Sequence, residues 1–327
     1  MKKLLIIFSV SILSFNLFAQ QRIEVKKINS HEISISTGDK VITNLMWIDT
    51  LEKPVLYPLY APSKEMITRG FPLQPRPEDP KDHPHHMGLW LNYESVNGLD
   101  FWNNSYERAG VKHKYGSIKL DSILKMESGN EGVVSYAGHW HDHQKQKLMQ
   151  EKTTYVFTAK DNQYIIDRYT ELTAVQSIVF KDVKDGLLGL RVRRELQIPT
   201  SDTDRLATGN YVTSEGKTGD DAWGTKASWC MLYGKLKNDL VSVLIIDHPK
   251  SFGYPTYWHA RGYGLFAANP LGRSVFSKGK EAANLRLKEG ESVRFQYRVV
   301  IGSGKERLSD AAIKQLEKEF ASTNWHQ

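Results

Sequence analysis

Short runs in which apolar and polar residues alternate recur along almost the whole chain, and they constrain its fold more than any other feature. His31–Thr37 is typical, because Ile33 and Ile35 stand two positions apart and Gly38 then favours a turn. Successive side chains of a strand point to opposite faces, so this alternation predicts half-buried β-strands. Turn residues separate the runs at spacings of roughly 8–15 residues, which is typical of antiparallel sheets. The other runs are 23–28, 116–124, 132–140, 152–158, 164–172, 187–198, 227–233, 240–246 and 293–301.

No helical pattern is inserted between these runs, and the sequence therefore predicts an all-β fold, a large antiparallel β-sandwich. The exception is a short helix near the C-terminus, where Ser309 can cap the first turn. Its apolar side chains recur at helical spacing and predict one buried stripe, formed by Ala312, Ile313, Leu316 and Phe320. The sequence shows no linker, repeat or low-complexity tract, so residues 20–327 are expected to form a single domain.

Residues 1–19 have the pattern of a secretory signal peptide. Lys2 and Lys3 precede an apolar stretch, Leu4–Phe18, and Ala19 offers a small residue at the cleavage point. A membrane anchor is the alternative, but the stretch falls short of the ~20 apolar residues that span a bilayer. No later segment of the sequence is apolar enough to do so. The mature protein is therefore expected to be periplasmic or secreted, in a bacterium, with no integral membrane segment.

Charge and cysteine content argue against several classes of protein. The formal net charge is +7, but basic residues are spread among acidic ones without a polybasic run, so no nucleic-acid partner is expected. Cys230 is the only cysteine, which rules out an intrachain disulfide, and its apolar surroundings predict a buried thiol. Gly216–Thr218 matches part of a phosphate-binding loop, but the upstream glycine is missing, so nucleotide binding is rejected. The 8 Trp and 15 Tyr residues either pack in the core or stack on sugar rings.

A proline-rich segment, 69–90, carries three histidines. Prolines exclude ladder pairing and stiffen a loop, and the apolar residues from Met87 onward predict the start of a buried strand. His83, His85 and His86 are therefore expected on a rigid loop that enters the core, where a polar site can be held in place. Because adjacent side chains of an extended chain point in opposite directions, at most two of the three histidines are expected to share one site.

Two histidine groups are candidates for a divalent metal site. In the loop, His83 and His85 together with Asp82 would supply three ligands. Farther along, His139 and His141 would share one face of a strand, about 7 Å apart. The alternatives are a loop whose histidines satisfy backbone groups and a solvated hairpin end. No metal or other cofactor is therefore assigned, and a divalent metal stays open.

The segment 254–272 combines a histidine, an arginine and several aromatic residues. His259 and Arg261 would lie on one face of a strand, and an arginine there suits the recognition of a carboxylate or of paired sugar hydroxyls. Trp258 directly precedes His259 in the sequence, and Asn269 ends the run before a proline. An aromatic-rich core strand is the alternative interpretation.

Several motifs resemble one bacterial protein family. In one-letter code they are RGFP at 69–72, HPHHMGLW at 83–90, NGLDFW at 97–102, DGLLGLR at 185–191, WC at 229–230 and WHARGYG at 258–264. This set is similar to DUF6807, a family of unknown function also labelled "PmoA family" or "methane oxygenase PmoA". A membrane methane monooxygenase subunit is built from spanning helices, which this sequence lacks after residue 19, so the label predicts nothing about its chemistry. Where relatives carry Lys-Glu-Gly, this chain has the shorter carboxylate of Asp185.

A weaker resemblance, at the level of the fold, is to galactose mutarotase-like supersandwiches. The segment Leu287–Arg298 is similar to the last strands of that fold. Mutarotases use a histidine acid and a late glutamate base, and no glutamate is present in Leu265–Pro270, so simple mutarotase chemistry is not expected.

The stiff histidine loop, the arginine-containing strand and the aromatic content together favour an exported carbohydrate-active protein. We expect acid/base chemistry of the lyase, epimerase or hydrolase type on a sugar or oxidised sugar, with His85 or His86 as acid or base and His259 as partner. A non-catalytic glycan-binding sandwich and a metal-dependent enzyme are the alternatives, and an oxygenase is the least favoured. The partner would be a small molecule or an oligosaccharide. The side chains expected to contact it are Arg69, Arg76, His83, Trp90, Trp223, Trp258, Arg261 and Asn269.

Overall fold

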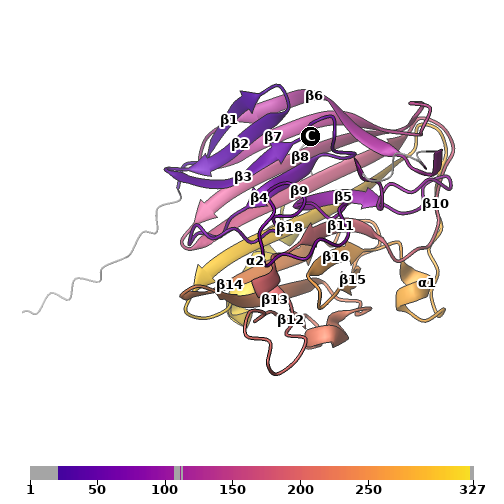
Figure 1. The fold of residues 1–327 in the computed structure, drawn as a ribbon. Helices are drawn as coiled ribbons and strands as arrows, with labels where there is room; N and C mark the ends of the chain where they lie inside the picture. Colours follow the sequence, from indigo (N-terminus) through magenta and orange to yellow (C-terminus); the bar gives the residue numbers. More distant parts are fainter. Residues whose placement is uncertain (1–20, 107–110, 112, 325–327) are drawn as a thin grey trace, which may run out of the picture.

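The computed structural model describes residues 21–106, 111 and 113–324. In this part of the chain the strands form two eight-stranded antiparallel sheets and a two-stranded ribbon, arranged in layers (Figure 1). The first sheet contains, in spatial order, β1 (Glu24–Asn29), β2 (Glu32–Thr37), β3 (Lys40–Met46), β4 (Val55–Leu59), β5 (Leu89–Tyr93), β11 (Gly186–Arg191), β16 (Leu265–Asn269) and β15 (Tyr257–Ala260). The second contains β12 (Asn210–Thr213), β13 (Trp229–Leu236), β14 (Asp239–Asp247), β18 (Ser292–Gly304), β9 (Gln163–Ala174), β8 (Lys147–Lys160), β7 (Gly132–His141) and β6 (Ser117–Glu127). The ribbon pairs β10 (Ile178–Phe180) with β17 (Leu285–Leu287).

The predicted all-β sandwich is confirmed, and each predicted run coincides with a strand. The run 187–198 is shorter than expected, because β11 ends at Arg191 and the chain then forms the 3-10 turn η2 (Arg194–Leu196). The other helical elements are η3 (Gly219–Ala222), α1 (Arg273–Phe276) and α2 (Asp310–Ala321). No helix in the described part of the chain is long and apolar enough to cross a membrane.

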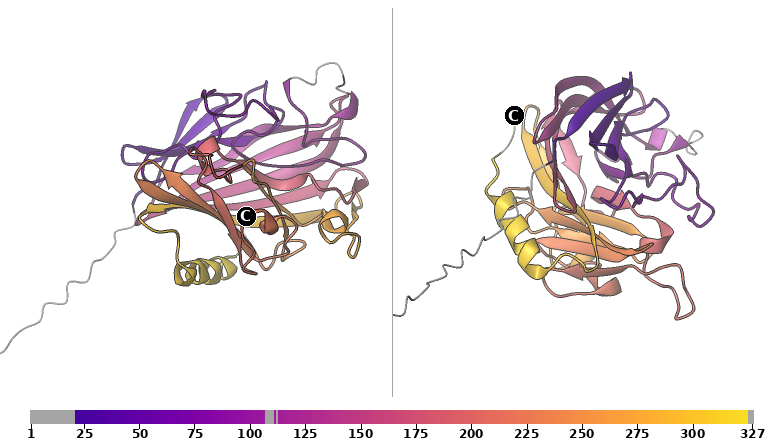
Figure 2. Two further views of the ribbon diagram at one scale, coloured as in Figure 1. Left: turned by 60° about the horizontal axis from the view of Figure 1, so that its bottom comes forward. Right: turned by 90° about the vertical axis from the view of Figure 1, so that its left-hand side faces the viewer.

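The C-terminal helix begins and packs as predicted. The Ser309 side chain accepts a hydrogen bond from the backbone N–H of Ala312, which caps the first turn of α2. The helix buries Ile313, Leu316 and Phe320. These side chains share an apolar cluster with residues of β8, β9, β13, β14 and β18, so α2 covers the second sheet on the side that faces away from the first (Figure 2).

The two sheets pack face to face through a single apolar core. Leu89 and Leu91 of β5 contribute to it from the first sheet, and Trp140 of β7 contributes from the second. Because side chains of a strand alternate, Trp90 and Asn92 point to the other face of the first sheet. We call this the outer face, and it carries most of the predicted site residues.

One row of paired residues on the outer face connects two of the predicted segments. Its members, in order across β15, β16, β11 and β5, are His259, Ala267, Gly189 and Trp90. Three strand spacings of about 4.8 Å separate the two ends of the row. A Cβ atom at Gly189 would lie 2.6 Å from the Trp90 ring, so the absence of a side chain allows the indole to lie over the sheet.

Candidate active site

The three histidines of the proline-rich loop lie together. Their ring centroids are 4.8 Å apart for His83 and His86, 4.3 Å for His85 and His86, and 5.6 Å for His83 and His85. The prediction that at most two could share one site is wrong, because the loop is not extended. His83 has a φ of 44°, and the backbone N–H of His86 donates to its carbonyl oxygen at 3.0 Å. This turn places all three rings on the same side of the loop.

Arg69 holds this turn in place. Its buried guanidinium donates to the carbonyl oxygens of Pro80 (3.3 Å), Asp82 (2.6 Å), His83 (2.8 Å) and His86 (3.0 Å). It also donates to the Asp82 carboxylate at 2.7 Å. The guanidinium is therefore occupied by the loop itself, which corrects the prediction that Arg69 binds ligand hydroxyls or a carboxylate. It is a positioning residue.

Asp82 connects two buried arginines to His83. Its Oδ1 accepts hydrogen bonds from Arg69 and Arg191 at 2.7 Å each, and its Oδ2 lies 2.7 Å from Nδ1 of His83. Burial alone would raise the pKa of Asp82, but the hydrogen bond with His83 and the charge of Arg191 lower it well below its usual range. The carboxylate is therefore ionised and fixes the orientation of the His83 ring, which leaves Nε2 as the reactive nitrogen.

His86 is held as a neutral imidazole. Its ring stacks between those of His83 and Trp90, with centroids 4.8 Å and 5.4 Å away. Nη1 of Arg191 lies 3.2 Å from its Nδ1, and since a guanidinium can only donate, the ring proton must be on Nε2. Burial, together with the positive charges of its neighbours, lowers the pKa of His86 well below its usual value. His86 is thus a weak acid/base at neutral pH and suits a role as hydrogen-bond donor.

His83 is the accessible member of the cluster. Its side chain is 43% exposed, whereas His85 and His86 are buried. The backbone of His85 is fixed by Lys53, whose Nζ donates to the His85 carbonyl oxygen at 2.8 Å. Trp90 forms the floor below the histidines, with its indole N–H bound to Asn92 at 2.9 Å. Because Trp90 is fully buried, it supports His86 instead of contacting a ligand, which corrects its predicted role.

Tyr263 joins the histidine loop to the second predicted segment. Its ring stacks on His83 with a centroid distance of 5.5 Å and an interplanar angle of 5°. The guanidinium of Arg191 lies 4.7 Å from the Tyr263 ring centre, and that of Arg261 lies 5.7 Å from it. Burial raises the pKa of Tyr263, so its phenol stays protonated at neutral pH. Two segments separated by more than 170 positions therefore meet at one place.

A groove of about 570 Å³ opens beside Tyr263. Arg261 is exposed in this groove, with its guanidinium 5.9 Å from the Trp223 ring centre. Trp223 is half-buried, and its indole nitrogen has no hydrogen-bond partner among the described residues. Asp220 and Thr200 add an acidic and a hydroxyl side chain. Aromatic walls with a few charged groups suit a sugar, whose faces are apolar and whose edges carry hydroxyls.

His259 lies on the outer face of the first sheet, at the opposite end from Trp90 of the row described above. Its Nδ1 is 3.6 Å from Oδ1 of Asp185, which is too long for a hydrogen bond, and has no hydrogen-bond partner in the described structure. Burial lowers the pKa of His259 to about 4, despite the opposite effect of Asp185. Glu94 and Asp100 lie near Asp185, and burial together with its negative charge raises the pKa of both. His259 is thus neutral, beside a group of carboxylates.

Three predicted ligand contacts have structural roles instead. Trp258 is fully buried in the core, because it faces inward where its neighbour His259 faces outward, and its indole donates to a backbone carbonyl. The amide of Asn269 is occupied by two backbone carbonyls and two backbone N–H groups, which close the turn after β16. Arg76 donates to Glu195 at 2.6 Å and so anchors the histidine loop to η2. None of the three is available to a ligand on the outer face.

The second histidine group does not join the first. The rings of His139 and His141 are 6.0 Å apart, and Nδ1 of His139 is hydrogen-bonded to the carboxylate of Asp121 on β6. His143 is exposed in the turn after β7. Among the described residues no three His, Cys, Asp or Glu side chains converge as metal ligands, in this segment or in the histidine loop.

The site includes residues that the sequence did not single out. Arg191, the last residue of β11, and Tyr263, at the turn between β15 and β16, were contained in recognised motifs without an assigned role. Asp82 was considered only as a metal ligand. Its position directly before His83 is the one local signal that could have indicated an orienting carboxylate.

The buried His259 predicts a pH dependence of stability. Its pKa is lowered from 6.5 to about 4 in the folded state, so the unfolded chain binds the proton more tightly between these values. Stability from this group is fully present above the unfolded pKa and is lost as the pH falls toward the folded one. The free energy of unfolding should therefore drop by about 2 kcal/mol between pH ~8 and pH ~5 because of this residue.

Urea unfolding of the wild type and of the His259→Asn variant at both pH values measures this contribution. The variant should lack that part of the pH dependence. An identical change with pH in both proteins would show that His259 is not held neutral.

Comparisons with known proteins give a family and a weak structural likeness. No curated protein matches the sequence. Solved structures with a similar fold include a galactose mutarotase related enzyme from Lactobacillus acidophilus (TM-score 0.36, 8% identity, 88% of this chain and 99% of that chain) and a GalM/aldose epimerase homologue from C. elegans (TM-score 0.33, 10% identity, 88% and 99%). A polysaccharide lyase matches with a TM-score of 0.35 and 8% identity over 92% of this chain and 35% of that chain. The weak resemblance to mutarotase-like proteins expected from the sequence is thus found. Residues 32–317 match the model of a family of unknown function, DUF6807, and the chain belongs to this family.

Proposed function

We propose that this protein catalyses proton transfer on a sugar acid, as an epimerase or a lyase does. The observation that carries the proposal is His83, an accessible imidazole oriented by Asp82 and stacked on Tyr263 beside a groove that contains Arg261. An oriented imidazole next to a bound substrate is the arrangement that general acid/base catalysis requires. The proposal replaces His85 and His86, which are buried, by His83 as the acid/base residue.

The charges near Tyr263 support an acidic substrate. Arg69 and Arg191 share the Asp82 carboxylate, Asp79 adds a second negative charge near Arg69, and the guanidinium of Arg191 lies 4.7 Å from the Tyr263 ring centre. Arg261 adds an exposed guanidinium in the groove. A guanidinium can bind a carboxylate through two parallel hydrogen bonds and so fix its orientation.

The same charges assist the chemistry. The proton on the carbon next to a carboxylate becomes more acidic when a positive group neutralises the carboxylate, because the negative charge that develops on proton removal is stabilised. Nε2 of His83 would remove this proton. Return of a proton to the opposite face gives an epimer, whereas loss of the leaving group on the next carbon gives an unsaturated sugar. The protonated phenol of Tyr263 is the candidate proton donor.

Proton exchange tests the proposal directly. The protein is incubated in D2O with D-galacturonate, D-glucuronate and oligomers of each, and the proton next to the carboxylate is followed by NMR. Ultraviolet absorbance follows any unsaturated product. We expect exchange or elimination with an acidic sugar and none with D-galactose. If no acidic sugar is bound or changed, the proposal is wrong.

A glycan-binding protein without catalytic activity is the second candidate. The observation in its favour is Trp223, a half-buried indole beside an exposed arginine in an open groove. Binding of acidic sugars without proton exchange, and with an affinity that depends on Trp223 and not on His83, would support it.

We also propose that the protein is exported and acts in the periplasm or outside the cell. The signal-peptide pattern of residues 1–19 supports this. N-terminal sequencing of the protein recovered from its native host should begin near Gln20, whereas an intact Met1 would contradict export by cleavage.

A further inference from the structure

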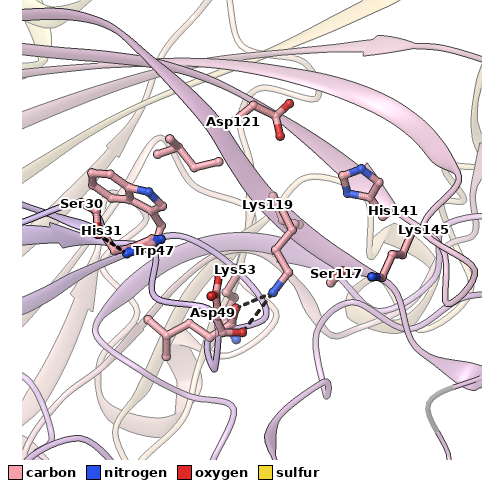
Figure 3. Close-up of a pocket in the computed structure, with 13 residues that line it drawn as sticks. Ser30, His31, Trp47, Asp49, Lys53, Ser117, Lys119, Asp121, His141 and Lys145 are labelled. Atoms are coloured by element: carbon pink, nitrogen blue, oxygen red, sulfur yellow. Dashed lines mark hydrogen bonds between the residues drawn. The ribbon is translucent and has the colours of Figure 1, made fainter.

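A second pocket lies apart from the groove at Arg261. It has a volume of about 520 Å³ and is formed where the residues around β3 meet β6 and β7. Figure 3 shows Trp47 and His141 on opposite sides of this pocket, with Lys119 between them. The size is in the range of small-molecule sites.

Lysines outnumber carboxylates among the residues that line this pocket. Three lysines face two aspartates, and one of these aspartates, Asp121, is already paired with His139 of β7. Lys119 is held by the backbone carbonyl oxygens of Asp49 and Leu51, at 3.3 Å and 3.0 Å, and its charge is compensated by Glu52 at 3.5 Å. Lys145, in the turn after β7, adds a positive charge at the rim. A negative group of a ligand would therefore gain favourable electrostatic energy next to the exposed Lys145.

The uncharged side chains in the pocket suit a sugar ring. Trp47 is partly exposed, and its indole lies at an angle of 61° to the His31 ring, with a centroid distance of 6.3 Å. On the other side, Nδ1 of His141 is buried and has no hydrogen-bond partner among the described residues. Burial lowers the pKa of His141, so it is a neutral ring that can exchange hydrogen bonds with hydroxyl groups. The exposed Asp49 supplies carboxylate oxygens for further hydroxyls.

The pocket adjoins the histidine loop through one residue. Lys53 lines the pocket, and its Nζ donates to the carbonyl oxygen of His85 while lying 5.4 Å from the Trp90 ring centre. The pocket and the groove at Arg261 have no lining residue in common. They are therefore two separate places at which a ligand can bind.

We propose that the pocket between Trp47 and His141 is a second binding site, which takes an acidic saccharide unit by stacking it on Trp47 and pairing its negative group with Lys145. This inference goes beyond the proposed catalytic function and does not depend on it, since the residues that would hold the ligand, Trp47, His141 and Lys145, have no part in that function.

Calorimetric titration with D-galacturonate tests the second site. The key variant is Lys145→Asn, because Lys145 has a φ of 66° and asparagine tolerates this left-handed conformation better than most residues. Lys278→Asn is the matched control, since Lys278 is an exposed lysine with a φ of 56° outside both cavities. Trp47→Phe removes much of the stacking surface. Arg261→Met removes the positive charge from the groove beside Tyr263.

We expect two binding events per chain in the wild type and in the control. Lys145→Asn and Trp47→Phe should each weaken one of them by about fivefold or more and leave the other unchanged. Arg261→Met should weaken only the binding event in the groove beside Arg261. D-galactose should bind the pocket more weakly than D-galacturonate.

The results for the two sites are distinguishable. The catalytic proposal fails if nothing binds at Arg261. In that case a single binding event that is weakened by Lys145→Asn still supports the second site. A single event that Arg261→Met abolishes, an unchanged titration of the Lys145 variant, or no binding of D-galacturonate at all would overturn the inference.

Discussion

Asp82→Asn is expected to lower the free energy of unfolding by about 3 kcal/mol, since it leaves two buried arginines without their shared counter-charge. The side chains of Arg69 and Arg191 have no exposed surface, whereas 38% of the Asp82 side chain is exposed. Water can therefore offset part of the lost interaction, which places the effect near the lower end of the ~3–5 kcal/mol found when a buried ion pair is broken. Urea unfolding at neutral pH measures the change.

A control variant and the dependence on pH distinguish this loss of stability from the effect of an ordinary surface substitution. Glu78→Gln is the matched control on the same loop, because Glu78 has a half-exposed side chain and pairs only loosely with Arg76, at 3.6 Å. It should change stability by less than about 1 kcal/mol. Acid should also remove the contribution of Asp82, because its pKa is lowered in the folded state and its stabilisation is lost as the pH falls below the usual range of an aspartate. Equal stabilities of the two variants would show that Asp82 does not hold the arginines.

His83→Asn is expected to lower the rate of proton exchange on a sugar acid by ~10²–10⁴-fold, the usual contribution of a general acid or base. Asparagine tolerates the φ of 44° at this position but cannot accept and release a proton near neutral pH. The other contacts of the loop, which Arg69 makes with backbone carbonyls, remain in the variant. Its stability should therefore stay close to that of the wild type, and the affinity for the sugar should change little.

The exchange rate measured by NMR, together with a calorimetric affinity, checks this prediction. His143→Gln, which replaces an exposed histidine in the turn after β7, is the control and should retain full activity. If the His83 variant exchanges protons at the wild-type rate, His83 is not the acid/base residue. If it loses affinity as well as rate, its role is in binding.

The strands were predictable from the sequence because each strand carries its own local signal. Period-two alternation identified β2, β7, β9 and β18, and the serine before α2 identified the start of the helix. The end of β11 was not predictable in this way. The stretch after Arg191 keeps apolar residues but turns into η2, where Glu195 binds Arg193 and Arg76. That turn depends on contacts with the histidine loop, which no local pattern contains.

The candidate site was predictable only in part, for the same reason. The sequence located the histidine loop and the segment around His259, but it did not show that they meet at Tyr263. It assumed an extended loop, whereas the turn at His83 depends on Arg69 binding four carbonyl groups. It also placed Trp258 at the site, although alternation from His259 puts this residue in the core. Consistent use of the strand period would have avoided that error.

The second pocket illustrates a further limit of local sequence patterns. Lys145 lies more than 90 positions after Trp47 and Lys53 and shares no motif with them, and only the pairing of the strands brings the three residues together. Lys53 is the clearest case, because burial lowers its pKa to about 7 at a position where the sequence shows only a charged residue in a loop.

A crystal structure of the His83→Asn variant with D-galacturonate tests the central claim most directly, since the variant binds the sugar without converting it. We expect the carboxylate within hydrogen-bonding distance of the Arg261 guanidinium and the neighbouring carbon facing residue 83, beside Tyr263. A sugar found only in the pocket at Trp47, or no sugar on the outer face of the first sheet, would contradict it.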